Sequence, residues 1–174
     1  ELQNNSYFIV CSSAGPRNEY DTNCYIGKYD TSSMEITFGY FPYNITEGHT
    51  THGMAITRIN SNTFLICYGE YIYREGVCIV GTVVGDFENG LNTPIKYGNK
   101  IQLDERRDID SVKMIHLDQT TLAICYTATV NNIGACRLAS VVEVGTSGEY
   151  TIIIGDDTFN YQFDGIDSPT VFRV

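Results

Sequence analysis

Short runs of alternating apolar and polar residues fill almost the whole chain, and turn-forming residues separate one run from the next. β-Branched residues and tyrosine dominate these runs, as in residues 63–69. Alternation over about four to eight residues is typical of a half-buried β-strand, whereas an amphipathic helix spaces its apolar residues about three or four positions apart. No segment has the helical spacing, so the sequence predicts an all-β protein.

The same pattern recurs along the chain in three copies. Residues 59–68 align without a gap on residues 117–126, a shift of 58 positions, and the same shift carries Cys78 to Cys136. A third copy lies upstream, where residues 7–11 match the first of these segments. Internal repeats of this kind indicate one structural unit used several times. The predicted repeats are residues 1–52, 53–110 and 111–165, followed by the start of a fourth at 166–174.

Each repeat is expected to form four antiparallel strands, named A to D in chain order. In the second repeat they lie at residues 53–59, 63–69, 76–85 and 93–98. In the third they lie at 111–117, 121–127, 133–142 and 149–154. The first repeat holds only B, C and D, at 6–12, 23–29 and 34–39. Residues 169–174 have the pattern of a strand A that no strand B follows.

Every repeat carries one cysteine near the end of strand B and one near the start of strand C. In an antiparallel hairpin these two cysteines face each other at a distance that a disulfide can bridge. Six cysteines allow about 15 pairings, and the repeat selects one of them. The predicted disulfides join Cys11 to Cys24, Cys67 to Cys78 and Cys125 to Cys136. The alternatives are reduced core thiols or a zinc site, and zinc is disfavoured because no Cys-x-x-Cys motif occurs.

Charge and composition exclude two broad classes of function. The chain of 174 residues has 11 Lys and Arg against 21 Asp and Glu, a net formal charge of −10. That charge repels nucleic acid and anionic membranes, so we expect neither as a partner. No uncharged apolar run approaches the roughly 20 residues of a membrane helix, so no membrane span is expected. The hydrophobic content of 43% is sufficient for a packed core.

Two features favour a secreted protein. The number of cysteines is even, and sequons for N-linked glycosylation start at Asn4 and Asn44. Asn44 falls in the connection after the first strand D, where a glycan can reach water, and Asn4 adjoins the first predicted strand. Because the sequence does not begin with Met, we expect a processed chain or a part of a longer one.

The sequence contains no recognised catalytic or cofactor motif: it lacks a nucleophile elbow, a phosphate-binding loop and a dinucleotide fingerprint. The closest metal motif pairs His49 with His52, but it falls in a predicted loop. Asp108 and Asp110 alternate only once, which is short of a calcium loop. We therefore expect no enzyme, no cofactor and no metal site. The 13 tyrosines leave glycan binding open, because each ring has an apolar body and a polar edge.

One segment pair carries a resemblance to a known architecture. Leu117-Asp118-Gln119-Thr120, followed by Cys125-Tyr126 and Cys136-Arg137, resembles the repeats of extracellular β-propeller-type proteins, in which a Leu-Asp-x-Thr segment precedes a paired-cysteine hairpin. The resemblance covers nearly the whole chain. It implies four-stranded blades arranged as in a propeller, and it assigns no chemistry.

The order of the strands suggests how such a chain functions. Propellers usually have about four to eight blades, whereas this chain has three sets of strands B, C and D with one strand A at its far end. We therefore expect the C-terminal strand, with Pro169, Val171 and Val174, to complete the first blade of a neighbouring copy, beside Tyr7 and Ile9. This predicts an extracellular structural or adhesive module that assembles head to tail. A ring closed by the chain's own strand and a lectin-like glycan-binding module are the alternatives.

Overall fold

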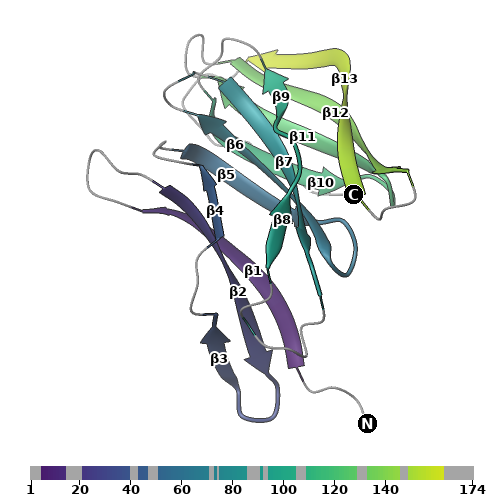
Figure 1. Ribbon diagram of the computed structural model, residues 1–174. Helices are drawn as coiled ribbons and strands as arrows, with labels where there is room; N and C mark the ends of the chain where they lie inside the picture. The colour runs from purple at the N-terminus through teal and green to yellow at the C-terminus, as the bar shows by residue number, and fades with distance from the viewer. Residues whose placement is uncertain are drawn as a thin grey trace. The chain divides into compact units, whose positions relative to one another are not determined.

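The computed structural model describes residues 5–14, 21–39, 43–46, 51–70, 73, 75–85, 91, 94–104, 109–128, 133–145 and 149–162. All regular elements in these ranges are strands, and they pair in antiparallel fashion into three sheets (Figure 1). The chain divides into two compact units. Residues 1–50 and 83–96 make up the first unit, and residues 51–82 and 97–174 make up the second.

The sheet of the first unit contains β1 (Asn5–Ala14), β2 (Asp21–Asp30), β3 (Glu35–Phe38) and β4 (Tyr43–Thr46). β1 and β2 pair along their whole length, which places Cys11 opposite Cys24. β3 and β4 pair one after the other with β2. β2 is therefore the central strand, with β1 at one edge.

The second sheet contains β5 (Thr51–Arg58), β6 (Thr63–Glu70), β7 (Glu75–Val83), β8 (Ile95–Tyr97) and β9 (Ile101–Asp104). Its strand order is β5-β6-β7-β8, and β9 also pairs with β7. Every residue of β6 is buried, as are most residues of β7. β6 and β7 place Cys67 opposite Cys78.

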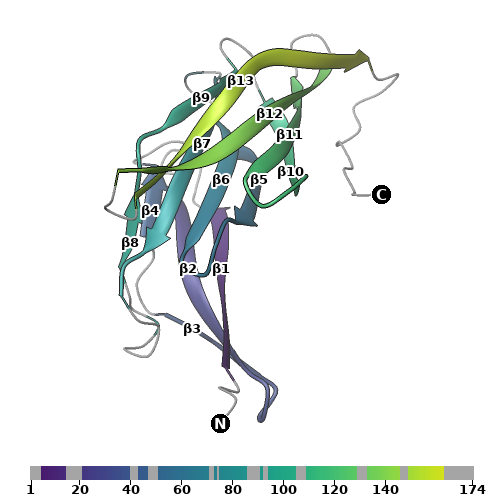
Figure 2. The same cartoon turned by 90° about the vertical axis from the view of Figure 1, so that its right-hand side faces the viewer.

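The third sheet is a simple meander of β10 (Ile109–His116), β11 (Thr121–Ala128), β12 (Ile133–Val144) and β13 (Glu149–Gln162). Each strand pairs with the next one in the chain, and Figure 2 shows the four strands side by side. β11 and β12 place Cys125 opposite Cys136.

The predicted all-β class and the order of the predicted strands are confirmed, and β3 and β8 end within one residue of the predicted ends at 39 and 98. The strand segments that follow these ends were not predicted, and β13 continues past its predicted end at residue 154. The chain continues past Gly39 and Gly98 into β4 and β9, and β13 runs through Gly155 to Gln162. In each sheet this continuation pairs with the beginning of the central strand that carries the second cysteine. The register shifts by a bulge at this point in the third sheet, between Arg137 and Ala139. The chain segments before and after each glycine pair with opposite ends of the same central strand. Glycine suits this point because its backbone tolerates the bend between the two pairings.

The three predicted disulfides are all present, and the part of the chain that the structure describes has no free cysteine. Their Cα atoms are 4.0, 4.1 and 4.0 Å apart, the close spacing of directly opposed residues in an antiparallel ladder. Each bridge closes a loop of 11 or 13 residues within one hairpin. The disulfides therefore reinforce local hairpins and do not join one sheet to another.

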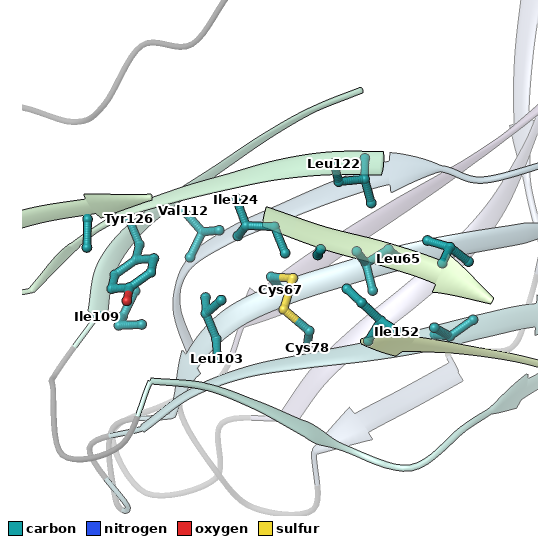
Figure 3. Close-up of a cluster of buried hydrophobic side chains, with 14 residues drawn as sticks. Leu65, Cys67, Cys78, Leu103, Ile109, Val112, Leu122, Ile124, Tyr126 and Ile152 are labelled. Atoms are coloured by element: carbon teal, nitrogen blue, oxygen red, sulfur yellow. A yellow bond between two sulfur atoms is a disulfide. The ribbon is translucent and has the colours of Figure 1, made fainter. Parts of the chain in front are cut away.

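The main core of the second unit lies between its two sheets (Figure 3). From the β5–β9 sheet it takes Leu65, the Cys67–Cys78 disulfide and Leu103, all fully buried. From the β10–β13 sheet it takes Val112, Leu122, Ile124, Tyr126, Ala135, Ala139, Val141 and Ile152. Alternate residues of each strand supply these side chains, as a sheet with one covered face requires.

One cross-strand position pairs a large side chain of the first strand with glycine or alanine of the second in all three hairpins. In the first two hairpins an aromatic ring of the first strand lies over a glycine of the second, so a Cβ atom at that glycine would overlap the ring. The same rings make edge-on contacts with the next strand, Phe8 with Phe38 at 5.7 Å and Phe64 with Tyr97 at 6.4 Å between centroids. The three pairs are Phe8 with Gly27, Phe64 with Gly81 and Leu122 with Ala139.

Candidate functional site

Two tight turns of the second unit are held by the same side-chain device. In the turn after β5, Asn60 Oδ1 accepts hydrogen bonds from the backbone N–H groups of Asn62 and Thr63, both at 2.9 Å. In the turn after β10, Asp118 Oδ1 accepts hydrogen bonds from the N–H groups of Thr120 and Thr121, both at 2.8 Å. Asn and Asp share this role because both offer a short side-chain oxygen to the backbone two or three residues ahead. The Leu-Asp-x-Thr segment is therefore a turn motif here.

The turn hydrogen bonds also fix the charge of Asp118. The backbone N–H groups of Thr120 and Thr121 stabilise its carboxylate and lower the pKa of Asp118 below its ordinary value of 3.8. Asp30 has the same arrangement in the turn between β2 and β3, where hydrogen bonds from Ser32, first from its hydroxyl at 2.6 Å, lower its pKa. Both side chains are exposed and both are ionised at neutral pH.

The strands β5 and β10 approach each other closely along their length. At one end His116 Nε2 lies 2.7 Å from the carbonyl oxygen of Arg58. At the other end Gly53 has a φ of 54°, and a Cβ atom there would overlap the backbone of Asp110. Both the positive φ and the lack of space require glycine at this position. The contact places the turns after β5 and β10 next to each other.

These two turns border an open cavity of about 850 Å³, which we name the turn cavity. It is lined by Arg58, Ile59, Asn60, His116, Leu117, Asp118, Gln119, Thr120, Val141 and Tyr150. Val141 is buried and forms an apolar part of the wall, while Asp118 and Gln119 are exposed at the rim. The cavity thus combines an apolar surface with a rim of polar side chains.

Several polar atoms in the turn cavity have no partner among the residues that the structure describes. Arg58 donates from Nε to the carbonyl oxygen of Asn60 at 2.9 Å, which leaves its two terminal nitrogens unpaired in this part of the chain. The backbone hydrogen bonds of the turn and that of the Thr120 hydroxyl all go to Oδ1 of Asp118, and Oδ2 is a second acceptor oxygen on this exposed side chain. The turn cavity therefore offers both hydrogen-bond donors and an anionic acceptor.

Other polar side chains of the second unit are committed to buried structural contacts. Tyr126 donates to Asp104 Oδ2 at 2.6 Å. Lys100 pairs with the buried carboxylate of Glu70, and Tyr68 donates to the same carboxylate oxygen at 3.5 Å. Burial raises the pKa of Tyr68, and the neighbouring charge of Glu70 raises it further, so the phenol stays protonated as a donor. Paired groups of this kind stabilise the interior.

Arg137 likewise serves the interior rather than a site. Its guanidinium donates to the carbonyl oxygens of Leu103 at 2.6 Å and of Gly155 at 2.9 Å. The first of these bonds joins the β10–β13 sheet to the β5–β9 sheet, and the second reaches the break in β13. A planar five-donor group is well suited to two separate carbonyl acceptors. The Cys-Arg dipeptide noted in the sequence thus has a structural role.

The structure places the remaining predicted residues as follows. Asn44 is exposed in β4, and Tyr7 and Ile9 are half-buried in β1. Asn4, Pro169, Val171 and Val174 lie outside the described residues, as do His49 and Asp108 of the candidate metal motifs. Among the residues that are described, no group of three or more His, Cys, Asp or Glu is placed to hold a metal ion. In the same ranges no long apolar helix that could cross a bilayer is present.

The edge of the first sheet differs from the corresponding edges of the other two. β6 and β11, which carry the first cysteine of their hairpins, each have a further strand beside them, β5 and β10. β1 carries Cys11 and pairs only with β2 in the described ranges. Among the residues that the structure describes, its second edge therefore lacks the neighbouring strand that the other two hairpins have.

The cysteine-bearing faces of two sheets also differ. In the β5–β9 sheet, Leu65 and Val80 on this face are buried, with 0% and 3% of their surface exposed. In the β10–β13 sheet, Leu138 at the position of Val80 and the neighbouring Phe159 are 46% and 62% exposed. An apolar face of this kind is typical of a surface that another sheet covers.

The sequence alone did not identify the turn cavity, although its shift of 58 positions aligns Arg58 with His116 and Asn60 with Asp118. No protein-family model matches the chain, and no curated protein or solved structure matches it either.

Proposed function

We propose that this chain is an extracellular structural or adhesive repeat module, whose propeller-like blades assemble with other copies by adding a strand to β1. The observation that carries the proposal is the second edge of β1, which lacks in the described ranges the strand that stands beside β6 and β11. An unpaired edge presents a row of N–H and C=O groups that a strand from another chain can satisfy. Residues 169–174 are the donor in this proposal, because residues 166–168 repeat residues 109–111, which places 169–174 at the position of residues 112–117 in the third repeat.

The exposed sheet faces support association between copies. On the β10–β13 sheet the exposed face includes Leu138, Ile153 and Phe159. On the first sheet the exposed apolar residues include Val10 and Phe38. A contact between two different faces is head to tail, so it produces a filament or, where the rotation closes, a ring of several copies. In either assembly these apolar side chains leave water.

Disulfides and glycosylation support the extracellular setting of this function. Three intact disulfides are typical of proteins that fold in an oxidising compartment. Asn44 is exposed and precedes Ile45 and Thr46, so its sequon is open to a glycan. A glycan there adds bulk and polarity to the side of the first sheet opposite β1.

Truncation of the C-terminal strand tests the proposal. The intact chain should show a mass in light scattering that rises with protein concentration, and a chain ending at residue 165 should stay monomeric with all three disulfides. A control chain carrying residues 166–174 in scrambled order should behave like the truncated one. Association that survives truncation, or an intact chain that is monomeric at every concentration, contradicts strand addition.

A further inference from the structure

We propose that the turn cavity binds a saccharide, independently of any assembly between copies. The cavity is formed entirely by the second unit, from the turns after β5 and β10 together with Val141 and Tyr150. It needs neither β1 nor the C-terminal strand of another copy. With a volume of about 850 Å³ it is large enough for a sugar ring, since ligand pockets commonly measure about 300–1,000 Å³.

The apolar part of the turn cavity suits the faces of a pyranose ring. Tyr150 is half-buried, and the lining also includes Ile59 and the buried Val141. The C–H groups on one face of a sugar ring are weakly apolar and pack against such surfaces. A tyrosine adds a hydroxyl at the polar edge of the same contact, so it can serve a ligand that is apolar on one side and wet on the other.

The polar part of the turn cavity suits neighbouring hydroxyl groups. Arg58 offers two terminal nitrogens as donors, and Asp118 Oδ2 offers a charged acceptor. A sugar hydroxyl donates and accepts at once, so a donor and an acceptor on the same rim can bind it on both sides. Charged partners form the stronger hydrogen bonds of this kind. Both side chains are held by contacts within their turns, and this reduces the loss of freedom on binding.

The same groups disfavour three other ligand classes. A polyanion is repelled by Asp118 and by the net charge of −10. A divalent cation needs several oxygen ligands, whereas the lining contains one carboxylate and the positive charge of Arg58. A purely apolar ligand would leave the polar atoms of the rim without partners. A neutral molecule with several hydroxyl groups can contact both the apolar wall and the polar rim atoms of the turn cavity.

Titration of the labelled full chain tests this proposal. Methyl mannoside, methyl galactoside and N-acetylglucosamine should be added in turn up to about 50 mM, because single sugars bind such open sites in the millimolar range. We expect at least one of them to shift the backbone amide signals of Asn60, Gln119 and Tyr150 in a saturable way. A neutral dipeptide serves as the competing ligand class. Absence of saturable shifts with every sugar, or stronger binding of the dipeptide, overturns the proposal.

Substitution of Asp118 separates binding from folding. Asp118→Asn keeps the Oδ1 acceptor of the turn, as Asn60 does in the neighbouring turn, and replaces the charged second oxygen by an NH2 group that donates instead of accepting. It should weaken sugar binding about tenfold, the effect of losing one hydrogen bond to a charged group, while the spectrum outside the cavity stays unchanged. Tyr150→Ala should weaken binding as well, and the matched control Tyr73→Ala, at an exposed position outside the cavity, should not. Equal affinity in Asp118→Asn and the original chain contradicts the proposed site.

This test is distinguishable from the assembly test. A chain ending at residue 165 keeps every residue of the turn cavity. It should therefore bind the sugar with unchanged affinity even where it no longer associates.

Discussion

The sheet of β1–β4 and the sheet of β10–β13 contain the same disulfide hairpin in different surroundings. The residue before the first cysteine is Val10 in one and Ile124 in the other. Val10 is 41% exposed, whereas Ile124 is fully buried against the β5–β9 sheet. β11 also has β10 beside it, and β1 has no second partner strand within the described ranges. Local sequence is thus sufficient to specify the hairpin, while its burial depends on what packs next to it.

Truncation of the two matched side chains should give the largest contrast. Ile124→Ala removes methyl groups from a packed core and should lower the free energy of unfolding by about 2–5 kcal/mol. Val10→Ala changes a partly exposed residue and should cost less than about 1 kcal/mol. Hydrogen exchange of the β1–β2 and β11–β12 peptides measures each hairpin separately, which matters because the chain divides into two units.

The same pair also reports on assembly. The decrease in the free energy of unfolding caused by Val10→Ala should be small at low protein concentration. It should be larger at concentrations where copies associate, because association would cover this face. A large loss at every concentration would mean that Val10 is as well packed as Ile124 in the isolated chain, and the contrast between the two sheets would be wrong.

Removal of a disulfide should affect the two hairpins almost equally. Loops of 13 and 11 residues give nearly the same chain entropy, so each double Cys→Ala variant should lose about 3 kcal/mol. The variants are Cys11→Ala with Cys24→Ala, and Cys125→Ala with Cys136→Ala. The stability of the two variants is compared by chemical denaturation, with hydrogen exchange measured separately for the β1–β2 and β11–β12 hairpins. A much larger loss in the third hairpin would show that its bridge also contributes packing against neighbouring strands.

The smallest expected effect concerns the stability of the folded chain at acid pH, to which the Asp30 and Asp118 turns contribute. Asp30 and Asp118 both have a lowered pKa in the folded chain, so their stabilising effect is complete above the ordinary value of 3.8 and is lost as the pH falls through the lower folded value. Melting temperature measured between about pH 2 and 6 should therefore fall at the acid end. Asp30→Asn and Asp118→Asn should each flatten this fall slightly. If both variants show the same dependence of melting temperature on pH as the original chain, these two turns do not cause the loss of stability in acid.

Repetition made most of the fold predictable from one sequence. Six cysteines have many pairings, but three copies of the same B–C spacing select Cys11 with Cys24 and its two counterparts, which the structure contains. The outer strands were harder to predict. Tyr43–Thr46 and Ile101–Asp104 are only four residues long, and each follows a glycine that ends an alternating pattern. They pair with the first residues of β2 and β7, which lie earlier in the chain, so no local pattern predicts the pairing.

The turn cavity could not be predicted for a different reason. Its residues come from turns of two sheets, and their proximity depends on how β5 and β10 pack, which no local pattern encodes. The identity of Gly53 reflects that contact, because its positive φ and the adjacent backbone of Asp110 exclude any side chain. In the sequence it is only the first residue of a predicted strand, with no sign of a neighbour from another sheet.

The aromatic ring over a glycine constrains how these repeats can diverge. Gly27→Ala would overlap the ring of Phe8, and Phe8→Leu alone would leave unfilled space above Gly27. Both changes together produce the Leu and Ala pair that Leu122 and Ala139 already form in the third hairpin. The two positions are therefore sterically coupled, so each single change is expected to destabilise the hairpin more than the double change does. We therefore expect copies of this hairpin to diverge at these sites through compensating changes on both strands, as the Phe–Gly and Leu–Ala pairs of this chain illustrate.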